Sequence, residues 1–326
     1  MRWRLAMADL REGIVLVTGA SGAIGSLLVR ELVSRAVRVR AAVRDPGSVE
    51  FDDRVEIVVG DLRDKSFVRA AVEGVDTIFH YAAKLHINRP TEELRQEYEA
   101  VNYRATRTLV ELSDCERFVS ASTINVYGTG GPFDESTAPQ PSGPYAETKL
   151  AAEKLVLKHP GGTVIRYAAV YGKGMKGNFP RLVKAIRSGR FAYVGPGTNR
   201  RTLIHEKDAV RAAILCAESD RSRGRVYNVT DGEVHTLETI VETIAKALGK
   251  KAPSIHLPES LARVAFAGGD VFLKFAGKEM RLTPLIEKIN EDIAVRGDLI
   301  REELGFDPEF GLEEGWKQVL RDVRGR

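Results

Sequence analysis

The sequence predicts an α/β fold, a doubly wound parallel sheet with a smaller C-terminal lobe, and two observations lead to this prediction. Short apolar runs typical of buried strands alternate with segments of helical periodicity through the first half of the chain. The first run, Ile14 to Val17, passes through three glycines into a segment whose apolar residues recur at helical intervals. Beyond Gly172 the alternation loosens, as expected where a second lobe begins.

The expected elements follow in chain order. Strands are expected at residues 14–17, 37–43, 55–59, 77–81, 117–121, 163–166 and 226–229. Helices are expected at residues 65–73, 91–112, 144–158 and 237–248. Residues 172–178 and 195–197 are rich in glycine and are expected to form loops, whereas residues 253–283 are the least predictable part.

The turn after the first strand suits an anion. Gly19, Gly22 and Gly25 are spaced by three where a strand, a tight turn and a helix meet. Such a turn directs free backbone N–H groups and the positive end of the helix at an anion, usually a pyrophosphate. The spacing differs from the commoner G-x-G-x-x-G, and glycine turns also serve purely structural ends.

Composition limits the class of protein. The chain has 326 residues, 43% of them hydrophobic, which is ordinary for a globular protein that buries a sizeable core. Its net charge is only +4 and no basic block stands out, so nucleic-acid binding is disfavoured. Two cysteines in apolar contexts predict neither a disulfide nor a metal framework and fit a reducing cytoplasm. No apolar run approaches the roughly 20 residues that span a bilayer, and no signal peptide is expected.

Tyr145 and Lys149 are the first candidates for chemistry. They lie four residues apart at the start of an expected helix, so their side chains share one face. The Lys149 cation would favour the phenolate and lower the Tyr145 pKa from its ordinary value of about 10, making Tyr145 a general acid or base. A solvated helix pair is the plain alternative. Hydroxyls at Ser120, Ser122 and Thr123, where a buried strand ends, lie where open α/β sheets bind their ligands.

Several motifs in this order and spacing resemble the extended short-chain dehydrogenase/reductases, which include sugar-nucleotide epimerases and dehydratases. The resemblance covers nearly the whole chain. Its motifs are Thr18-Gly-x-x-Gly-x-x-Gly25, Asp61-Leu62, His80-x-Ala-Ala83, Asn102, Ser122-Thr123-x-x-Val-Tyr-Gly128 and Tyr145-x-x-x-Lys149. It implies a Rossmann-type NAD(P)-binding domain over residues 1–172. Residues 173–326 would be mainly a substrate-binding lobe, with some elements returning to the main sheet.

The same resemblance implies roles for single residues. Tyr145 would be the acid/base, Lys149 its partner and a ribose ligand, and Thr123, rather than Ser122, the catalytic hydroxyl. Asp61 and Leu62 would border the adenine, and Asn102 would lie beneath the catalytic lysine. The whole implied cofactor site comprises Gly19, Ser21, Gly22, Ala23, Ile24, Arg44, Asp61, Leu62, Ala82, Ala83, Asn102, Tyr145, Lys149 and Tyr167. No metal is expected.

Two positions depart from the family pattern. The acidic residue that usually ends the second strand and holds a ribose 2′-hydroxyl is replaced by Val43, followed by Arg44. An arginine there suits a 2′-phosphate and makes NADP the favoured cofactor, although Arg44 could also stack on the adenine or face water. A glycine often precedes the second strand, and Ala36 in its place is expected only to adjust the turn.

The second half contains candidates for substrate binding. Lys176-Gly-Asn178-Phe179 and Asn199-Arg-Arg201-Thr-Leu-Ile-His205 are similar to the pattern of nucleotide-sugar 4-epimerases and 4-ketoreductases. By this resemblance Asn178 and Arg201 would contact the diphosphate and nucleotide, since a guanidinium forks across phosphate oxygens. One of Arg200 and Arg201 is expected in a solvated loop. Lys84 is placed near the substrate by position alone, and both His80 and His205 are expected to be structural.

These observations favour hydride transfer at C4 of a nucleotide-linked hexose, by an epimerase or a reductase. One alternative is a reductase of lipophilic ketones or 3-hydroxysteroid-like substrates, suggested by the apolar cluster from Leu261 to Phe275. Another is a non-catalytic NAD(P)-sensing protein. By analogy with the family a homodimer is expected, although Val101, Leu109 and Leu112 of the first interface helix could equally serve packing within one chain.

Overall fold

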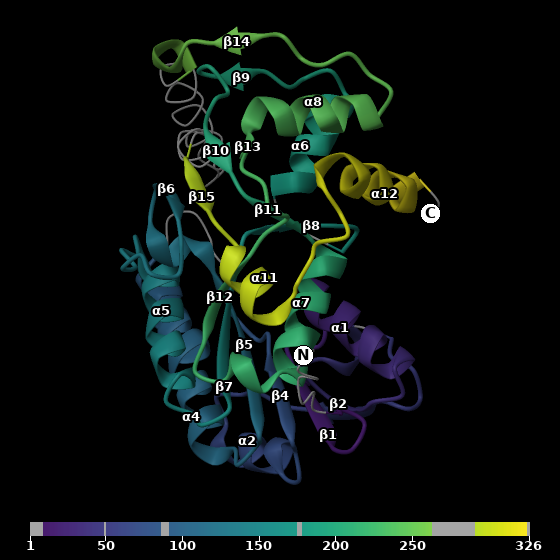
Figure 1. The fold of residues 1–326 in the computed structure, drawn as a ribbon, viewed down its shortest axis with the longest axis vertical. Helices are drawn as coiled ribbons and strands as arrows, with labels where there is room; N and C mark the ends of the chain where they lie inside the picture. The colour runs from purple at the N-terminus through teal and green to yellow at the C-terminus, as the bar shows by residue number, and fades with distance from the viewer. Residues whose placement is uncertain (1–8, 49, 86–90, 175–177, 263–290, 325–326) are drawn as a thin grey trace, which may run out of the picture.

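A seven-stranded parallel sheet forms the centre of the molecule (Figure 1). The computed structural model describes residues 9–48, 50–85, 91–174, 178–262 and 291–324. The strand order is β12-β7-β5-β4-β1-β2-β3, and each neighbouring pair is parallel. The strands are β1 (Ile14–Thr18), β2 (Arg38–Val43), β3 (Glu56–Val59), β4 (Thr77–His80), β5 (Arg117–Thr123), β7 (Gly162–Tyr167) and β12 (Val226–Val229). The predicted doubly wound parallel sheet is confirmed.

Strand β1 is the point at which the order of the strands in the sheet reverses. It pairs with β2 on one side, with Ile14 opposite Arg38, and with β4 on the other, with Thr18 opposite His80. The chain winds outward from β1 through β2 and β3, then returns to β4 and continues the other way. Ligands of open α/β sheets bind at the carboxyl ends of the strands beside such a reversal. Gly19, Arg44, Ala82 and Thr123 follow or end strands at this edge.

Helices cover both faces of the sheet (Figure 1). One face packs against α1 (Ala23–Ser34) and α7 (Glu206–Glu218), with Leu28 and Leu32 in its core. The other packs against α2 (Lys65–Val72), α4 (Ala105–Leu112) and α5 (Pro144–Val156). Apolar side chains of the strands alternate between these two cores, because successive residues of a strand point to opposite faces.

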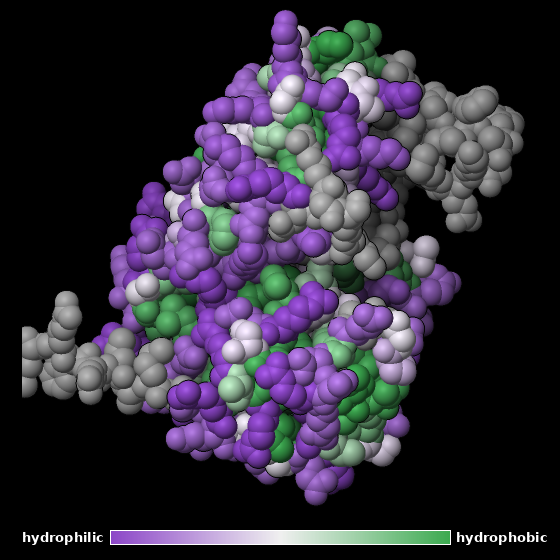
Figure 2. Space-filling view, turned by 90° about the vertical axis from the view of Figure 1, so that its right-hand side faces the viewer, coloured by the Kyte–Doolittle hydropathy of each residue, from purple (hydrophilic) through white to green (hydrophobic). Residues whose placement is uncertain are grey.

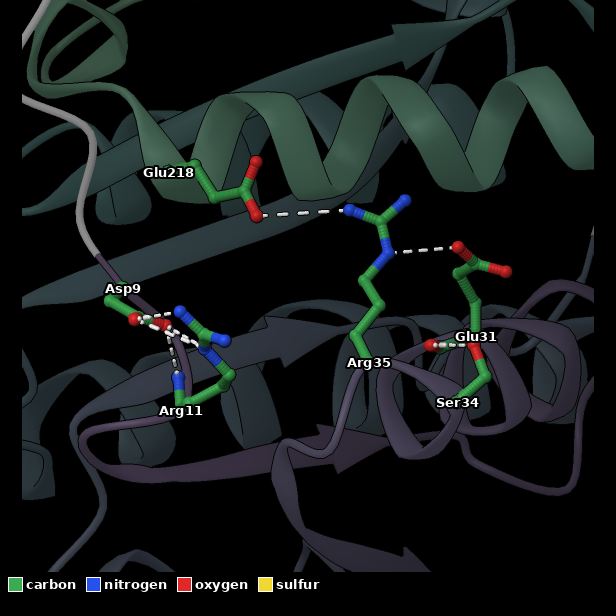
Figure 3. A network of polar contacts seen from close by, with 6 residues as sticks. All are labelled: Asp9, Arg11, Glu31, Ser34, Arg35 and Glu218. Atoms are coloured by element: carbon green, nitrogen blue, oxygen red, sulfur yellow. Dashed lines mark hydrogen bonds and ion pairs between the residues drawn. The ribbon is translucent and has the colours of Figure 1, made fainter.

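Helices α1 and α7 are also linked at their ends by charged side chains (Figure 3). Arg35, which caps the end of α1, donates from Nε to Glu31 Oε1 at 2.8 Å. Its Nη1 lies 3.8 Å from Glu218 Oε1 at the end of α7. Exposed pairs of this kind contribute little to stability, so the apolar contact between the two helices dominates their packing.

The helix expected at residues 91–112 is divided. It consists of α3 (Glu92–Tyr98), a π-helical segment from Glu99 to Arg104, and α4. The π-helical segment carries Asn102, whose side chain is buried. Wide turns of this type often occur at functional sites because they turn one side chain inward. The other expected strands and helices of the main sheet end within a few residues of their observed bounds.

In the part of the chain that the structure describes, the second lobe contains three helices that pack together and several short strands. The helices are α6 (Asn178–Arg187), α8 (Leu237–Ala247) and α12 (Leu312–Arg324), and they share a core with Tyr171, Tyr193 and Trp316. The strands are β6 (Gly130–Phe133), β8 (Ala169–Tyr171), β9 (Tyr193–Val194), β10 (Arg200–Arg201), β11 (Leu203–His205), β13 (His235–Thr236), β14 (His256–Leu257) and β15 (Ile293–Val295). Helix α11 (Asp298–Leu304) packs on β12.

Elements of the second half do return to the main sheet. Strand β12 pairs with β7, with Val226 opposite Val164, and α7 packs on the face that carries α1. The domain boundary after residue 172 stays a prediction. The face of the molecule in Figure 2 is largely hydrophilic, with smaller hydrophobic patches between charged side chains. Among the residues that the structure describes, no helix combines the length and apolar character needed to cross a membrane.

Candidate active site

The glycine turn between β1 and α1 forms one wall of the site. Gly19 has φ +68°, and a Cβ there would lie 2.6 Å from the backbone nitrogen of Ala82. The Gly22 N–H donates to Gly19 O at 2.9 Å, and a Cβ on Gly25 would collide with that same carbonyl oxygen. The first amides of α1 have no acceptor within the helix and point into this turn. The turn is therefore able to hold a pyrophosphate, and its role as a cofactor site stays a prediction.

His80 at the end of β4 holds the start of this turn in place through hydrogen bonds. Its Nδ1 lies 2.7 Å from the Thr18 hydroxyl and its Nε2 2.9 Å from the Thr106 hydroxyl. Burial, with a smaller contribution from the Lys149 charge, lowers the pKa of His80 to about 3. The Thr18 hydroxyl also accepts the Ala82 N–H at 3.3 Å. His80 is thus a neutral structural residue, which confirms the expectation.

Helix α5 brings the proposed catalytic residues to the end of β5. Gly143 precedes the helix with φ +85°, and Pro144 occupies its first turn, where a missing N–H costs no helical bond. The Tyr145 and Thr123 hydroxyls share a hydrogen bond. One turn further along α5, Lys149 Nζ donates to the Ala121 carbonyl oxygen at 2.6 Å. The Ser122 hydroxyl is directed instead to the buried Glu153 carboxylate.

The expected lowering of the Tyr145 pKa by Lys149 is wrong for this structure. Burial raises the pKa of Tyr145 to about 12, the Tyr98 phenol adds to the rise, and the hydrogen bond to Thr123 opposes it. Lys149 directs its amine at Ala121 O, so its charge does not offset the burial of the phenol. Burial also lowers the pKa of Lys149 to about 8, and the Glu153 carboxylate opposes this.

Asn102 is positioned between two parts of the site. Its Oδ1 accepts the Lys84 N–H at 2.8 Å, and its Nδ2 donates to the Lys84 carbonyl oxygen at 3.2 Å. The same Nδ2 lies 3.5 Å from the Thr148 hydroxyl, beside Lys149. Asn102 therefore joins the loop after β4 to the helix that carries Lys149. The Lys84 amine itself forms an ion pair of 2.5 Å with Glu97, which argues against the substrate contact expected of it.

Charged residues gather at the adenine end of the predicted dinucleotide site. The Asp61 carboxylate accepts hydrogen bonds from Arg63 at the backbone nitrogen, at Nε and at Nη2. These contacts, with burial opposing them and the Arg44 charge contributing, lower the pKa of Asp61. Arg44 is exposed at the end of β2, and its charge also reaches Glu97. The Arg63 partner escaped the sequence analysis, although its place two residues after Asp61 was a usable signal.

Tyr167, expected near the cofactor, has its hydroxyl engaged elsewhere. That hydroxyl lies 2.6 Å from the Tyr81 hydroxyl and donates to the Ala209 carbonyl oxygen at 2.9 Å. The side chain is almost fully buried, and burial raises its pKa far above the ordinary value. Tyr167 therefore links the end of β7 to β4 and α7, and only its ring and backbone remain for a cofactor.

The second lobe separates the two adjacent arginines. Arg200 is the structural one, because its Nη2 pairs with Asp292 Oδ2 at 2.7 Å and also donates to the Gly131 carbonyl oxygen. Arg201 is more deeply placed, and burial lowers its pKa while Glu291 and Asp292 oppose this. Asn178 is the exposed first residue of α6. His205 accepts the Lys207 N–H at the start of α7, in a structural role as expected.

Glu206 was missed by the sequence analysis. Its buried carboxylate accepts the Lys173 N–H at 2.9 Å and the Gly174 N–H at 3.2 Å. A Cβ on Gly174 would lie 3.6 Å from the Ala23 side chain, so this loop is held close to the first turn of α1. Within the described residues, no group of three or more His, Cys, Asp or Glu side chains is arranged to hold a metal ion.

Comparison with known proteins assigns the family. The model of the NAD dependent epimerase/dehydratase family matches residues 15–230. The chain belongs to this family. Its similarity to epimerases and dehydrogenases of the extended short-chain dehydrogenase/reductase type identifies it as an enzyme and confirms the resemblance seen in the sequence. Family membership supports a nicotinamide cofactor.

Relatives within this family have diverse names. The chain is 30% identical to a 4-hydroxy-2-methyl-3-oxo-4-farnesyl-3,4-dihydroquinoline-1-oxide ketoreductase of Stigmatella aurantiaca, over 92% of this chain and 93% of that protein. It is 29% identical to a 3-beta-hydroxysteroid dehydrogenase of Mycolicibacterium neoaurum (94% and 90%) and 28% to a UDP-glucose 4-epimerase of Vibrio cholerae (94% and 94%). Among solved structures, MoeE5 in complex with UDP-glucuronic acid and NAD is 30% identical with a TM-score of 0.76, covering 96% of this chain and 99% of that one.

Proposed function

We propose that this enzyme transfers hydride at C4 of a nucleotide-linked hexose, as an epimerase or a reductase. The observation that carries the proposal is the contact of the Tyr145 phenol with the Thr123 hydroxyl, one helical turn from the buried Lys149 amine. The Tyr145 proton donor, the Thr123 hydroxyl and the Lys149 cation then lie together at the carboxyl end of β5, close to the point where the strand order reverses. A solved neighbour, MoeE5, was crystallised with UDP-glucose and NAD, which supports a substrate of this class.

Each of these side chains has a defined task in the proposal. The bound dinucleotide supplies or accepts the hydride. Tyr145 as the phenol, its main form at neutral pH, gives a proton to the C4 oxygen during reduction. In the oxidation direction the phenolate takes the proton of the C4 hydroxyl as the hydride leaves C4, so the phenol must first lose its own proton. Thr123 donates a hydrogen bond to that same oxygen. An epimerase would allow the 4-keto sugar to turn and receive the hydride on its other face, whereas a reductase would need a fresh reduced dinucleotide in each cycle.

The proposed dinucleotide is NADP rather than NAD. Arg44 stands exposed directly after β2, next to Val43, which replaces the acidic residue that usually ends this strand in the family, and the nearby Asp61 carboxylate is already occupied by Arg63. A guanidinium in that position can pair with a 2′-phosphate. Against this, the solved neighbour MoeE5 holds NAD. The preference therefore rests on Arg44.

The proposed diphosphate site lies in the second lobe. Asn178 begins α6, and Arg201 is the partly buried arginine whose pKa is lowered by burial. A guanidinium taken out of water gains more from a doubly charged partner than an exposed one does. Arg200 is held by Asp292 and is not part of this proposal.

A second candidate is a reductase of lipophilic ketones or 3-hydroxysteroid-like substrates. The names of two relatives, a steroid dehydrogenase and a ketoreductase of a farnesylated quinoline, favour it. The apolar cluster that suggested it lies mostly outside the described residues, which include only Leu261 and Ala262 of residues 261–275. A non-catalytic sensor is set aside because the chain is an enzyme by family and keeps the Thr123, Tyr145 and Lys149 set.

Protection from thermal unfolding separates the two candidates. The full chain with NADP is heated with UDP or dTDP, and in parallel with a steroid or a long-chain ketone. A rise in Tm with a nucleoside diphosphate supports the nucleotide-sugar proposal, because a ligand that binds only the folded state stabilises it. A rise with the steroid or ketone and none with any nucleoside diphosphate would reverse the order of the candidates.

A further inference from the structure

Helix α5 is attached to the end of β5 at three successive residues. Its side chains at intervals of four, Tyr145, Lys149 and Glu153, reach Thr123, Ala121 and Ser122 respectively. The first two contacts belong to the proposed catalytic set. The third has no role in the proposed chemistry, yet it involves a carboxylate that is only 3% exposed.

Glu153 is held in place by Arg166 of β7. The guanidinium Nη2 lies 2.7 Å from Glu153 Oε2, and Nε donates to both carboxylate oxygens at 3.1 and 3.2 Å. Arg166 is itself 5% exposed. Taking two charges out of water is costly, and apolar side chains of similar size would often serve packing as well or better. The presence of this ion pair beside the active site is therefore not explained by stability alone.

The pair also reaches the turn that follows the catalytic threonine. Arg166 Nη1 donates to the Tyr127 hydroxyl at 2.8 Å, and that hydroxyl donates to Asn228 Oδ1 at 3.0 Å. Tyr127 ends the short helical turn Ile124–Tyr127, in which the Asn125 N–H donates to the Thr123 hydroxyl. The Glu153–Arg166 pair is therefore connected to Thr123 both through Ser122 and through Tyr127.

The charge of the Glu153 carboxylate also acts on the Lys149 amine. Burial lowers the pKa of the Lys149 amine to about 8, and the Glu153 carboxylate opposes this from one turn away. The other titratable groups around Lys149 do not replace it. On β4, His80 has a pKa of about 3 and is uncharged at neutral pH, and Tyr145 on α5 has a pKa of about 12 and is also uncharged. Arg166 on β7 is compensated by Glu153 itself.

We propose that Glu153, held by Arg166, is a positioning residue that keeps the Lys149 ammonium charged and fixes the end of β5 against α5. The proposal rests on the proposed role of Lys149 in the dinucleotide site, and not on the identity of the sugar or ketone substrate. Loss of the Glu153 charge leaves the burial of Lys149 unopposed, so the amine loses its proton at a lower pH than in the native enzyme.

The test is the affinity for NADPH measured across pH 6 to 10 with the full chain. The native enzyme is expected to lose affinity as pH rises through the Lys149 pKa, because the ammonium attracts the anionic dinucleotide. Glu153→Gln keeps the shape of the side chain and should move this loss to a pH lower by about one unit, or roughly fivefold weaker binding near the native midpoint. Lys149→Met should abolish the pH step and so identify it. Measuring both in the Tyr145→Phe background removes any contribution of that phenol.

Two further variants keep the proposal open to refutation. Should Glu153→Gln fail to fold, Glu153→Met with Arg166→Met replaces the ion pair by apolar side chains. Because this double variant also removes the Arg166 cation, it should shift the pH step downward by less than Glu153→Gln would. Arg117→Met is the matched control, since Arg117 is buried at the opposite end of β5 and pairs with Asp220 at 2.8 Å. It should lower Tm and leave the step in place.

A native pH step in the Glu153 variants, with only a lower Tm, would reduce the pair to a structural role and overturn the proposal. Because NADPH binding requires no sugar, this result is independent of the thermal-shift test of substrate class.

Discussion

Tyr145 and Thr123 share a hydrogen bond that joins the first turn of α5 to the last residue of β5. Thr123 also caps the turn after β5 by accepting the Asn125 N–H at 3.2 Å, so its hydroxyl is fixed by both contacts. Tyr98 of α3 packs edge-on against the Tyr145 ring at 5.8 Å between centroids. The phenol is thereby held in one place, which is a requirement for proton transfer to a positioned substrate atom.

Changing Tyr145 to Phe should reduce turnover by roughly 10²–10⁴, the usual range for loss of a general acid or base. The ring contact with Tyr98 is kept, so dinucleotide affinity and Tm should stay close to native values. Steady-state kinetics on the substrate class found by thermal shift gives the measurement. Near-native turnover in this variant would remove Tyr145 from the mechanism.

The cofactor preference depends on Arg44. We expect the native enzyme to bind NADPH roughly tenfold or more tightly than NADH, because a charge-assisted contact to the 2′-phosphate adds to binding even at an exposed site. Arg44→Ala should bring the two affinities together, and Arg54→Ala, an exposed arginine paired with Asp52, should leave the ratio unchanged. Equal affinities in the native enzyme, or an unaltered ratio in Arg44→Ala, would contradict this expectation.

Ala36 gives a prediction about stability. It has φ +60° in the turn before β2, a left-handed conformation that costs an alanine about 1–2 kcal/mol. Ala36→Gly should relieve this strain and, after the greater chain entropy of glycine, raise the free energy of unfolding by about 0.5–1 kcal/mol. Chemical denaturation measures the change. The reverse substitution, Gly249→Ala, is the comparison, because Gly249 has φ +70° and open space around its Cβ position, and it should destabilise. No gain in Ala36→Gly would mean that the turn is not strained.

Local patterns explain what the sequence predicted well. The strands of the main sheet are short apolar runs, and the glycine spacing after β1 is a local requirement of the turn, since Cβ atoms at Gly19 and Gly25 would collide with neighbouring backbone. Both features are properties of a few consecutive residues. The placement of Tyr145 and Thr123 together followed from the family resemblance and the rule that ligands meet the carboxyl ends of strands.

What the sequence missed depends on contacts between distant segments. The rise in the Tyr145 pKa comes from burial and from Tyr98, which lies 47 positions earlier in the chain. The ion pair of Lys84 with Glu97 and the hydrogen bond from the Lys173 N–H to the Glu206 carboxylate are likewise tertiary contacts. Helical periodicity also hides the π-helical segment around Asn102, because a single wide turn shifts the apolar pattern by only one residue.

A homodimer remains a prediction. In the family the helix that bears Asn102 and the helix that bears Tyr145 pack against their copies, but Leu109 is fully buried within this chain and so serves its own core. Val101 and Leu112 are only partly buried, although Leu112 also packs against this core. Light scattering at micromolar concentration should give twice the mass of one chain. A monomeric mass would contradict the analogy.

The last prediction concerns Arg201 and the class of substrate. If the substrate carries a diphosphate, Arg201→Ala should raise its KM by roughly one to two orders of magnitude and leave dinucleotide affinity unchanged, since loss of a charged hydrogen-bonding partner costs about 1.5–3 kcal/mol. Arg200→Ala removes the same charge from the same lobe, but that guanidinium is engaged by Asp292 and the Gly131 carbonyl. It should lower Tm more than it changes KM. A neutral ketone gains nothing from the Arg201 guanidinium, and apolar burial would supply its binding instead. A native KM for the nucleotide sugar in Arg201→Ala would therefore remove this residue from the diphosphate site, whichever candidate the thermal-shift test favours.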